Sequence, residues 1–215
     1  MELAYLSLNT LKTAIRISFS TRRLIRGMIG LRSYKICLLG DQGVGKTSLK
    51  QSFFGIPFHS HYMMTMRIDF TLKEVEIEGE TIQLQLWDVS GHPSVKHVRK
   101  RYIQDADGII LVFDLTRERS FQNIIAWIKE IIVNCTKPVV LQIIGNKADL
   151  EEDLTLVQKD EIDSLIDHLH KEVIAKQFQK IGYFVCSAKT RLNIDEVFLS
   201  LILAKRDSNE KSEFL

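Results

Sequence analysis

Hydrophobic positions follow two alternating patterns from Tyr34 onward. Short β-branched or aliphatic runs alternate with longer stretches in which apolar residues recur every three or four positions. The first pattern is typical of buried strands and the second of amphipathic helices. Their alternation predicts an α/β fold in which helices cover both faces of a mostly parallel sheet. The run Gly108–Asp114 is apolar throughout, as expected for a central strand covered on both sides.

The remaining elements are predicted by the same two criteria. Further strands are expected at Tyr34–Leu39, Phe70–Ile77, Thr81–Asp88, Val139–Ile144 and Tyr183–Cys186. Helices are expected from Lys46 to Phe53–Phe54 and at Ser120–Ile132, Ile162–Phe178 and Ile194–Leu203. Glu78-Gly79-Glu80 separates two alternating runs and therefore predicts an antiparallel hairpin. The result is a six-stranded, mostly parallel sheet with one antiparallel edge strand.

Length and composition are those of one α/β domain. The chain has 215 residues, of which 45% are hydrophobic, and a net charge of +2. Such a chain buries one good core but is too short for two ordinary domains. Cys37, Cys135 and Cys186 lie singly in apolar surroundings, so we expect reduced, buried thiols in an intracellular protein.

Positive charge is concentrated at the N-terminus. Residues 1–33 contain six basic residues and one acidic residue, a net charge of +5, which leaves −3 for residues 34–215. The body of the protein therefore gives no sign of a nucleic-acid partner. Lys12, Arg16, Arg23 and Arg26 share one side of a helical wheel, although Ile15 and Phe19 interrupt that face.

Three interpretations of this N-terminal extension stay open. It is a basic amphipathic helix that contacts an anionic membrane or a partner, which we favour slightly, or an organellar targeting segment. In the third, translation starts at Met28, six residues before the first predicted strand. The chain then divides into the extension 1–33, a domain at 34–206 and a short polar tail at 207–215.

A phosphate-binding loop follows the first predicted strand. Gly40-Asp41-Gln42-Gly43-Val44-Gly45-Lys46-Thr47 matches G-x-x-x-x-G-K-[ST] and stands directly before a predicted helix. In such a loop, backbone N–H groups and the helix N-terminus attract phosphate oxygens. Lys46 is expected to reach the β- and γ-phosphates, and the Thr47 hydroxyl to bind Mg²⁺. The predicted phosphate-binding residues are Gln42, Gly43, Val44, Gly45, Lys46, Thr47 and Ser48.

Two further motifs specify the base. Asn146-Lys147-Ala148-Asp149 follows one strand, and Ser187-Ala188-Lys189 follows the last. The Asp149 carboxylate can accept hydrogen bonds from N1–H and the 2-amino group of guanine, whereas adenine offers neither donor there. This argues against the third function considered, an ATP-dependent phosphoryl-transfer enzyme. With the phosphate loop, these motifs resemble those of the Ras-superfamily GTPases, whose fold is a P-loop NTPase G domain.

The resemblance implies a GTP/GDP molecular switch that requires Mg²⁺. Trp87-Asp88-Val89-Ser90-Gly91 is similar to the family's W-D-T-A-G, so Asp88 would hold Mg²⁺ and the Gly91 amide would bind the γ-phosphate. Thr65 stands where the family has its switch threonine and would contact both groups only in the triphosphate state. Loss of the γ-phosphate releases both loops. Phe58 matches the aromatic residue that packs edge-on against guanine.

Within the superfamily, the Rab branch is the most similar. Thr65-Met66-Arg67-Ile68-Asp69-Phe70 resembles T-I-G-x-D-F, and Ile82–Asp88 resembles a Rab interswitch strand. The similarity spans roughly residues 34–205. It implies effector proteins that contact switch loops near 59–70 and 88–102, an exchange factor and an activating protein. Met66 and Arg67 depart from the pattern, so the choice of effector cannot be carried over.

His92 departs from the pattern at a catalytic position. The resemblance places there the glutamine that orients the attacking water, and an imidazole differs in reach and geometry. Pro93 stiffens the following segment, and Gln42 is larger than the residue that many relatives carry. We therefore predict slow intrinsic hydrolysis, with His92, Lys46 and Thr65 as the catalytic residues. Two alternatives stay open: His92 or a partner orients the water, or the chain is a GTP-locked pseudo-GTPase scaffold.

Three remaining features lead to weaker predictions. The last residues, Ala204–Leu215, contain no cysteine, so we expect no C-terminal prenyl group. The protein is expected to be cytoplasmic, with membrane association through residues 1–33. His59, His61 and His97 are expected to be solvated, as are His168 and His170 on a predicted exposed helix. The run Glu151–Gln179 has room for an extended helix, with Leu165, Ile166, Leu169, Val173 and Phe178 as its apolar side.

Overall fold

The structure is a computed structural model that describes residues 32–59, 68–150, 156–171 and 177–213. The N-terminal predictions therefore lie outside the described residues. So do those for His61, Thr65 and Val173, and part of the first predicted switch loop.

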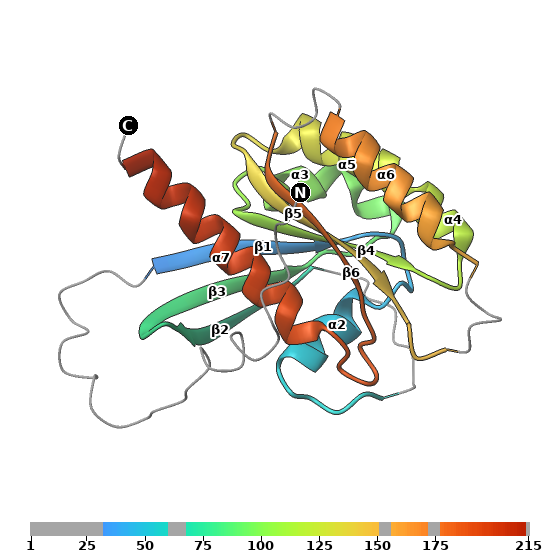
Figure 1. Cartoon of the computed structure of the whole chain (residues 1–215), viewed down its shortest axis with the longest axis horizontal. Helices are drawn as coiled ribbons and strands as arrows, with labels where there is room; N and C mark the ends of the chain where they lie inside the picture. Colours follow the sequence, from blue (N-terminus) through green and yellow to red (C-terminus); the bar gives the residue numbers. More distant parts are fainter. Residues whose placement is uncertain (1–31, 60–67, 151–155, 172–176, 214–215) are drawn as a thin grey trace.

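Six strands form a single sheet in the order β2-β3-β1-β4-β5-β6 (Figure 1). Their bounds are β1 Arg32–Leu39, β2 Asp69–Ile77, β3 Glu80–Asp88, β4 Gly108–Asp114, β5 Val139–Asn146 and β6 Phe178–Val185. β2 runs antiparallel to β3, and the other neighbouring strands are parallel. This confirms the predicted mixed sheet with one antiparallel edge strand.

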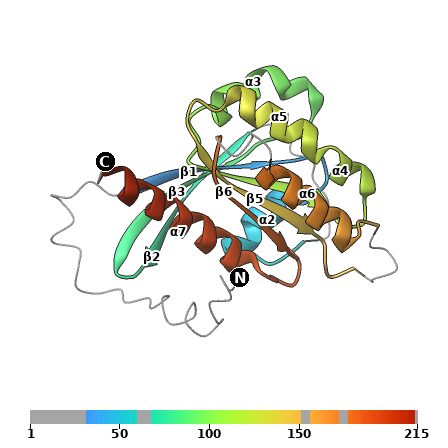
Figure 2. The same cartoon turned by 45° about the horizontal axis from the view of Figure 1, so that its top comes forward.

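Helices cover both faces of this sheet (Figures 1 and 2). Their bounds are α2 Lys46–Phe53, the 3₁₀ turn η1 Pro93–Val95, α3 Lys96–Ile103, α4 Glu118–Gln122, α5 Ile124–Asn134, α6 Lys159–Lys171 and α7 Ile194–Glu213. Buried side chains of α2 and α7 pack on one face, and those of α3, α5 and α6 on the other. None of the helices in the described ranges is both long and apolar enough to cross a membrane.

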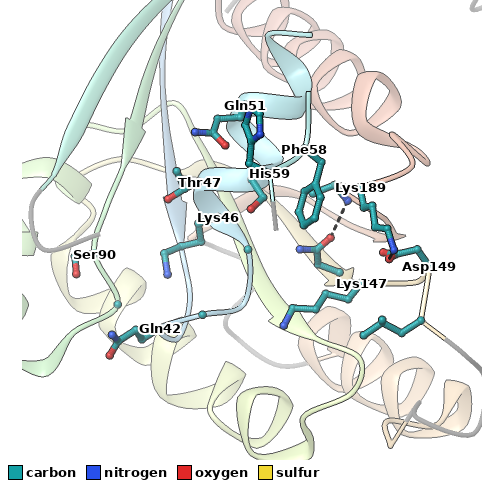
Figure 3. Close-up of a pocket in the computed structure, with 17 residues that line it drawn as sticks. Gln42, Lys46, Thr47, Gln51, Phe58, His59, Ser90, Lys147, Asp149 and Lys189 are labelled. Atoms are coloured by element: carbon teal, nitrogen blue, oxygen red, sulfur yellow. Dashed lines mark hydrogen bonds and ion pairs between the residues drawn. The ribbon is translucent and has the colours of Figure 1, made fainter. Parts of the chain in front are cut away.

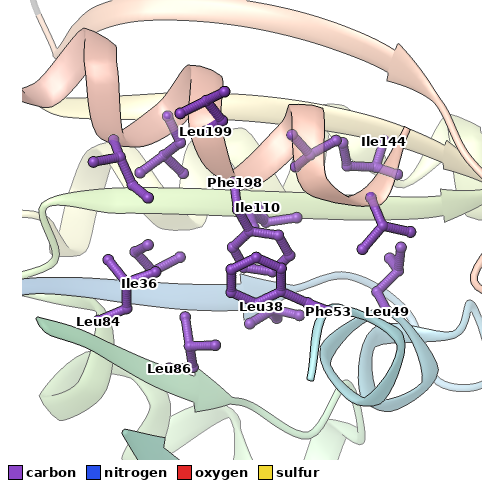
Figure 4. Close-up of a cluster of buried hydrophobic side chains, with 14 of the residues drawn as sticks. Ile36, Leu38, Leu49, Phe53, Leu84, Leu86, Ile110, Ile144, Phe198 and Leu199 are labelled. Atoms are coloured by element: carbon purple, nitrogen blue, oxygen red, sulfur yellow. The ribbon is translucent and has the colours of Figure 1, made fainter. Parts of the chain in front are cut away.

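An aromatic pair anchors the helix that follows the phosphate loop. The rings of Phe53 in α2 and Phe198 in α7 stack with centroids 3.7 Å apart (Figure 4). Both side chains are buried, and burial of a phenylalanine stabilises a fold by about 1.5–3 kcal/mol. The contact therefore fixes the position of α2, whose first residues Lys46 and Thr47 face the site described below.

The hairpin turn has the geometry that its sequence predicts. Glu78 and Gly79 both have positive φ, 51° and 83°. Two central residues with positive φ match the right-handed twist of the flanking strands, and glycine adopts this conformation without strain. The β2–β3 register, from Asp69 opposite Asp88 to Ile77 opposite Glu80, is continuous as a result.

The predicted helix Ile162–Phe178 is wrong at its C-terminal end. The described part of α6 spans Lys159–Lys171, and Phe178 begins β6, which therefore starts before the predicted Tyr183. Phe178 is buried and pairs with Val139 of β5. An isolated apolar residue fits a helix face or a buried strand equally well, so spacing alone could not assign it.

Three other segments also differ from their predictions. The predicted helix Ser120–Ile132 is divided at Asn123 into α4 and α5. The segment 88–102, expected to be a loop, contains η1 and α3; α3 buries only Arg99 and Ile103, so it lacks the apolar stripe that reveals a helix. α7 continues to Glu213 through the predicted polar tail, because that stretch lacks glycine and proline although its apolar periodicity ends.

Several side-chain predictions are confirmed. Cys37, Cys135 and Cys186 are buried and free. The described histidines expected to be solvated, which are His59, His97, His168 and His170, are exposed.

Candidate functional site

A cavity of about 600 Å³ opens beyond the carboxyl ends of the parallel strands, where α/β sheets generally bind ligands. Its volume lies within the range of small-molecule sites. Figure 3 shows Phe58, Lys147, Asp149 and Lys189 at one end, Gln42 and Ser90 at the other, and Lys46 and Thr47 between them.

Most of the predicted site residues line this cavity. They are Gln42, Gly43, Gly45, Lys46, Thr47, Ser48, Phe58, Gly91, Asn146, Lys147, Asp149, Ala188 and Lys189. The predicted residues that do not line it are Val44, Asp88, His92 and Ser187. Gln51, His59, Ser90 and Leu150 also line it and were not predicted. His59, Ser90 and Leu150 each adjoin a predicted site residue in the chain, and only that adjacency could have indicated them.

Two close backbone approaches shape the phosphate end. A Cβ on Gly40 would lie 2.1 Å from the Val112 carbonyl oxygen, and Gly40 has a φ of 130°. A Cβ on Gly91 would lie 2.4 Å from the Gly40 carbonyl oxygen. Only glycine fits at either position, so Gly91 lies directly against the phosphate loop.

Lys46 is buried at the base of this loop. Its Nζ donates to the carbonyls of Gly40 at 2.8 Å and Asp41 at 2.7 Å. Burial of the ammonium lowers the Lys46 pKa to about 8, although the Asp88 and Asp41 carboxylates oppose the shift. A buried cation beside a cluster of backbone N–H groups is suited to an anion.

Thr47 and Asp88 meet at the edge of the phosphate end. The Thr47 hydroxyl donates to one Asp88 carboxylate oxygen at 2.5 Å. The other oxygen, Oδ1, is buried without a hydrogen-bond partner in the described residues, and burial raises the Asp88 pKa. A hydroxyl and an unpartnered buried carboxylate oxygen are hard donors of the kind that Mg²⁺ prefers, so these two residues fit the predicted metal.

Asn146 joins the two ends of the cavity. Its side-chain amide donates to the Val44 carbonyl at 2.8 Å, and its side-chain oxygen accepts from the Ala188 N–H at 3.2 Å. A Cβ added to Gly45 would lie 2.2 Å from the Asn146 amide nitrogen. Asn146 therefore ties the phosphate loop to the loop after β6, and Val44 contributes its backbone instead of lining the cavity.

The Asp149 carboxylate is held by residues of the loop after β6. Oδ1 accepts from the Ser187 hydroxyl at 2.6 Å, and Oδ2 lies 3.4 Å from the Lys189 ammonium. The Asp149 side chain is only 9% exposed. A fixed, largely desolvated acceptor discriminates between bases by the donors that they present.

Lys147 is fixed from the opposite side. It has a φ of 73°, and its Nζ lies 2.6 Å from the Asp114 carboxylate at the end of β4. That carboxylate also accepts from the Thr116 backbone N–H and hydroxyl. The Lys147 stem therefore extends along the cavity, as Figure 3 shows.

A buried arginine holds the segment that covers the phosphate loop. Arg99 of α3 is paired bidentately with Glu130 of α5, at 2.8 and 3.3 Å. It also donates to the Ser90 carbonyl at 3.2 Å, and its guanidinium lies 4.4 Å from the Trp127 ring centroid. Since Gly91 follows Ser90, Arg99 fixes the backbone that lies on the loop.

Trp127 of α5 and two residues that precede this helix also hold the phosphate loop. The indole N–H of Trp127 and the side-chain amide of Asn123 donate to the two Asp41 carboxylate oxygens, at 2.9 and 2.7 Å. Arg117 donates to the Gln42 carbonyl at 2.8 Å. These residues belong to no recognisable motif, so sequence reasoning did not identify them.

The comparisons with known proteins agree with this geometry. A model described as "Ras family" matches residues 35–206. The chain belongs to the Ras family. It is also 41% identical to the Ras-related protein Rab-13 of Rattus norvegicus over 168 residues, 78% of this chain and 77% of that one. It is 35% identical to the Ras-related protein RAB1BV of Beta vulgaris, over 83% of this chain and 81% of that one. The predicted Rab-like, small GTP-binding class is thereby confirmed.

His92, which is predicted to occupy the position of the water-orienting residue, bonds within its own turn and does not line the cavity. Its Nδ1 accepts from the Ser94 backbone N–H at 3.2 Å and lies 2.7 Å from the Ser94 hydroxyl. The ring thus caps η1, in which Pro93 is the first residue. The catalytic role of His92 remains a prediction.

Proposed function

We propose that this Ras-family chain is a GTP/GDP switch with slow intrinsic hydrolysis, acting in Rab-like membrane traffic or signalling. The observation that carries the proposal is the arrangement of one cavity. The residues proposed to bind phosphate and those proposed to select guanine line the same cavity, whereas His92 does not line it and is hydrogen-bonded to Ser94.

At the phosphate end, each residue has a definite task. The Lys46 ammonium donates to the Gly40 and Asp41 carbonyls. With nucleotide bound, it would donate to the phosphate oxygens instead. Thr47 and Asp88 would hold Mg²⁺, which neutralises phosphate charge when bound. Gly91, positioned by Arg99 through Ser90, would offer its backbone N–H to the γ-phosphate. Thr65 is proposed to complete the metal and γ-phosphate contacts.

At the base end, selectivity rests on Asp149. Ser187 and Lys189 orient its carboxylate toward the guanine N1–H and 2-amino group. Lys147 lies along the base, and Phe58, which is 45% exposed and lines the cavity, covers it from the side. Adenine would leave the carboxylate lone pairs that face the base without donors, which costs about 1–3 kcal/mol.

Hydrolysis is expected to be slow because the water-orienting glutamine is missing. His92 meets its hydrogen-bonding capacity at Nδ1 through Ser94, and Pro93 restricts the backbone that would have to swing inward. Loss of a water-positioning group raises the barrier by roughly 1.5–4 kcal/mol, about ten- to a thousand-fold in rate.

Single-turnover hydrolysis of pre-bound GTP tests this proposal. The wild-type chain should hydrolyse GTP slowly, and His92→Gln should restore the rate by about ten- to a thousand-fold. Exposed His97→Gln, five residues away on α3, is the matched control and should leave the rate unchanged. Wild-type hydrolysis at the rate of a Rab that has its glutamine would refute the slow-hydrolysis proposal.

The second candidate function is a GTP-locked scaffold. The capped turn at His92–Val95 favours it, because that turn occupies the place of a freely moving catalytic segment. If both the wild type and His92→Gln bind GTP but neither hydrolyses it, the scaffold is the better description.

Three aromatic side chains in contact with one another connect the two proposed switch segments. Phe70 contacts Trp87 with ring centroids 4.6 Å apart, and Trp87 contacts Tyr102 at 5.2 Å. Phe70 is 44% exposed. We propose that effectors contact this surface, within the predicted segments 59–70 and 88–102, and that exchange and activating proteins act on the same segments. Cytoplasmic localisation and membrane contact through residues 1–33 also remain predictions.

A further inference from the structure

Helix α2 buries two lysine side chains. Lys46 and Lys50 lie one turn apart on the same side of the helix, and both are buried. Lys46 belongs to the phosphate loop, whereas Lys50 does not line the cavity and takes no part in the nucleotide contacts proposed above. Because a buried ammonium group is costly unless it is paired and hydrogen-bonded, Lys50 must be held by specific partners.

The main partner of Lys50 is Asp69, the first residue of β2. Their side chains form an ion pair, and the Lys50 ammonium also donates to the Thr71 hydroxyl at 3.4 Å. The Lys50 side chain is 7% exposed, whereas that of Asp69 is 60% exposed. The pair therefore ties α2 to the point at which β2 begins, within the first proposed switch segment.

Asp69 is also a neighbour of the proposed metal ligand Asp88. The two residues stand directly opposite each other in the antiparallel β2–β3 ladder. Side chains of directly opposite residues lie on the same face of a sheet, where like charges repel each other. Burial raises the Asp88 pKa; among the charges around it, the Lys50 ammonium opposes this rise and the Asp69 carboxylate adds to it. Lys50 is therefore a counter-charge for both carboxylates.

Mg²⁺ is suited to the same negative charge. Asp88 has one buried oxygen without a hydrogen-bond partner in the described residues, and its other oxygen accepts from Thr47. A nearby ammonium group repels a metal ion at this site, whereas a nearby unpaired carboxylate attracts it. By pairing with Asp69, Lys50 keeps this second carboxylate from adding to the attraction.

We propose that Lys50 lowers the affinity of the Thr47–Asp88 site for Mg²⁺ by neutralising Asp69 beside it. The inference deepens the proposed function and rests on it. Because bound Mg²⁺ neutralises phosphate charge, a site that releases the metal more readily also releases the nucleotide more readily. Lys50 would thereby favour nucleotide exchange.

A purely structural role of the ion pair leads to the opposite expectation. If Lys50 only held α2 against β2, its removal would loosen the metal ligands and weaken Mg²⁺ binding. If Lys50 acts through its charge, its removal leaves Asp69 unpaired beside Asp88 and strengthens Mg²⁺ binding. The sign of the change in Mg²⁺ affinity therefore separates the two roles.

The test measures dissociation of a fluorescent GDP analogue from the full chain at a series of free Mg²⁺ concentrations. The concentration at which the rate lies midway between its metal-free and metal-saturated values reports the Mg²⁺ affinity. The variants are Lys50→Met, Asp69→Asn and the two changes combined. Lys180→Met is the matched control, because it removes the same charge from an exposed lysine of β6.

Lys50→Met is expected to lower this midpoint concentration at least about three-fold, and Asp69→Asn to raise it at least about three-fold. The double variant restores the net charge and should return to within about two-fold of the wild type, as should the control. An unchanged or raised midpoint in Lys50→Met would overturn the inference. Should Asp69→Asn fail to fold because it leaves a buried lysine unpaired, Lys50→Met and the double variant decide the matter alone.

Failure of this inference is distinguishable from failure of the proposed function. A wild-type chain that binds neither GDP nor GTP would refute both. Nucleotide binding by the wild type, with equal midpoints in the wild type and Lys50→Met, would refute only the role of Lys50. A lowered midpoint in Lys50→Met together with fast hydrolysis in the wild type would support Lys50 and refute only slow hydrolysis.

Discussion

At the base end of the cavity, polar side chains are ordered by partners from several strand ends, whereas at the switch end one buried arginine holds the backbone. Asp149 has Ser187 and Lys189, and Lys147 has Asp114. Ser90 and Gly91 depend on Arg99 and on contact with the phosphate loop. The base end follows its motifs without a departure, while the sequence predicts His92 where the family resemblance places a glutamine at the switch end. We infer that this chain recognises guanine as its family does but hydrolyses GTP more slowly.

The largest effect is expected from breaking the switch end at Arg99. Arg99→Met leaves Glu130 partly buried without its cation, which costs about 3–5 kcal/mol in the free energy of unfolding. Urea denaturation measures this loss. Exposed Arg101→Met is the control and should change stability by no more than about 0.5 kcal/mol.

A double variant separates the loss of the Arg99–Glu130 ion pair from the loss of the hydrogen bond to Ser90. Arg99→Met with Glu130→Met replaces the pair by apolar side chains and should recover much of the lost stability. The GTP-analogue affinity of this variant should still fall relative to its GDP affinity, because the Ser90 carbonyl has lost its donor. An unchanged ratio would contradict the positioning of Gly91 by Arg99.

The next effect is expected from Asp149→Asn at the base end. The amide oxygen still accepts from Ser187, but the amide cannot accept from both guanine donors. GTP affinity should fall by about 2–4 kcal/mol, roughly thirty- to a thousand-fold. Calorimetric titration with GTP and with ATP measures both affinity and preference. Asp163→Asn on exposed α6 should change neither, and an unchanged GTP-over-ATP preference in Asp149→Asn would refute its role.

The smallest effect is expected from Asp114→Asn, which tests how the base end holds Lys147. Asp114→Asn weakens the hold on Lys147, whose side chain is 36% exposed, so the loss should be about 1 kcal/mol, roughly five-fold in affinity. Affinities for GTP and GDP should fall together, as measured by nucleotide dissociation rates, because the base is common to both. A loss confined to GTP would place Asp114 at the switch end instead.

Most of the cavity was predictable because its motifs are local. The phosphate loop needs glycines at fixed positions between a strand and a helix, and all of these are adjacent in sequence. The two guanine motifs stand at strand ends, and parallel strands bring such ends to one edge. Phe178 and the helix at 96–103 were missed for the opposite reason: neither has a periodic apolar pattern that identifies its element.

By itself, the sequence determined the α/β order, the nucleotide motifs and the departure at His92, because each is a matter of residue type and spacing. Only the tertiary structure decided how these parts are held. It paired Arg99 with Glu130, set Trp127 and Asn123 on Asp41, and brought Tyr102 of α3 against Trp87. Such contacts join residues far apart in the chain, and their geometry depends on how helices pack on the sheet, which no local pattern encodes.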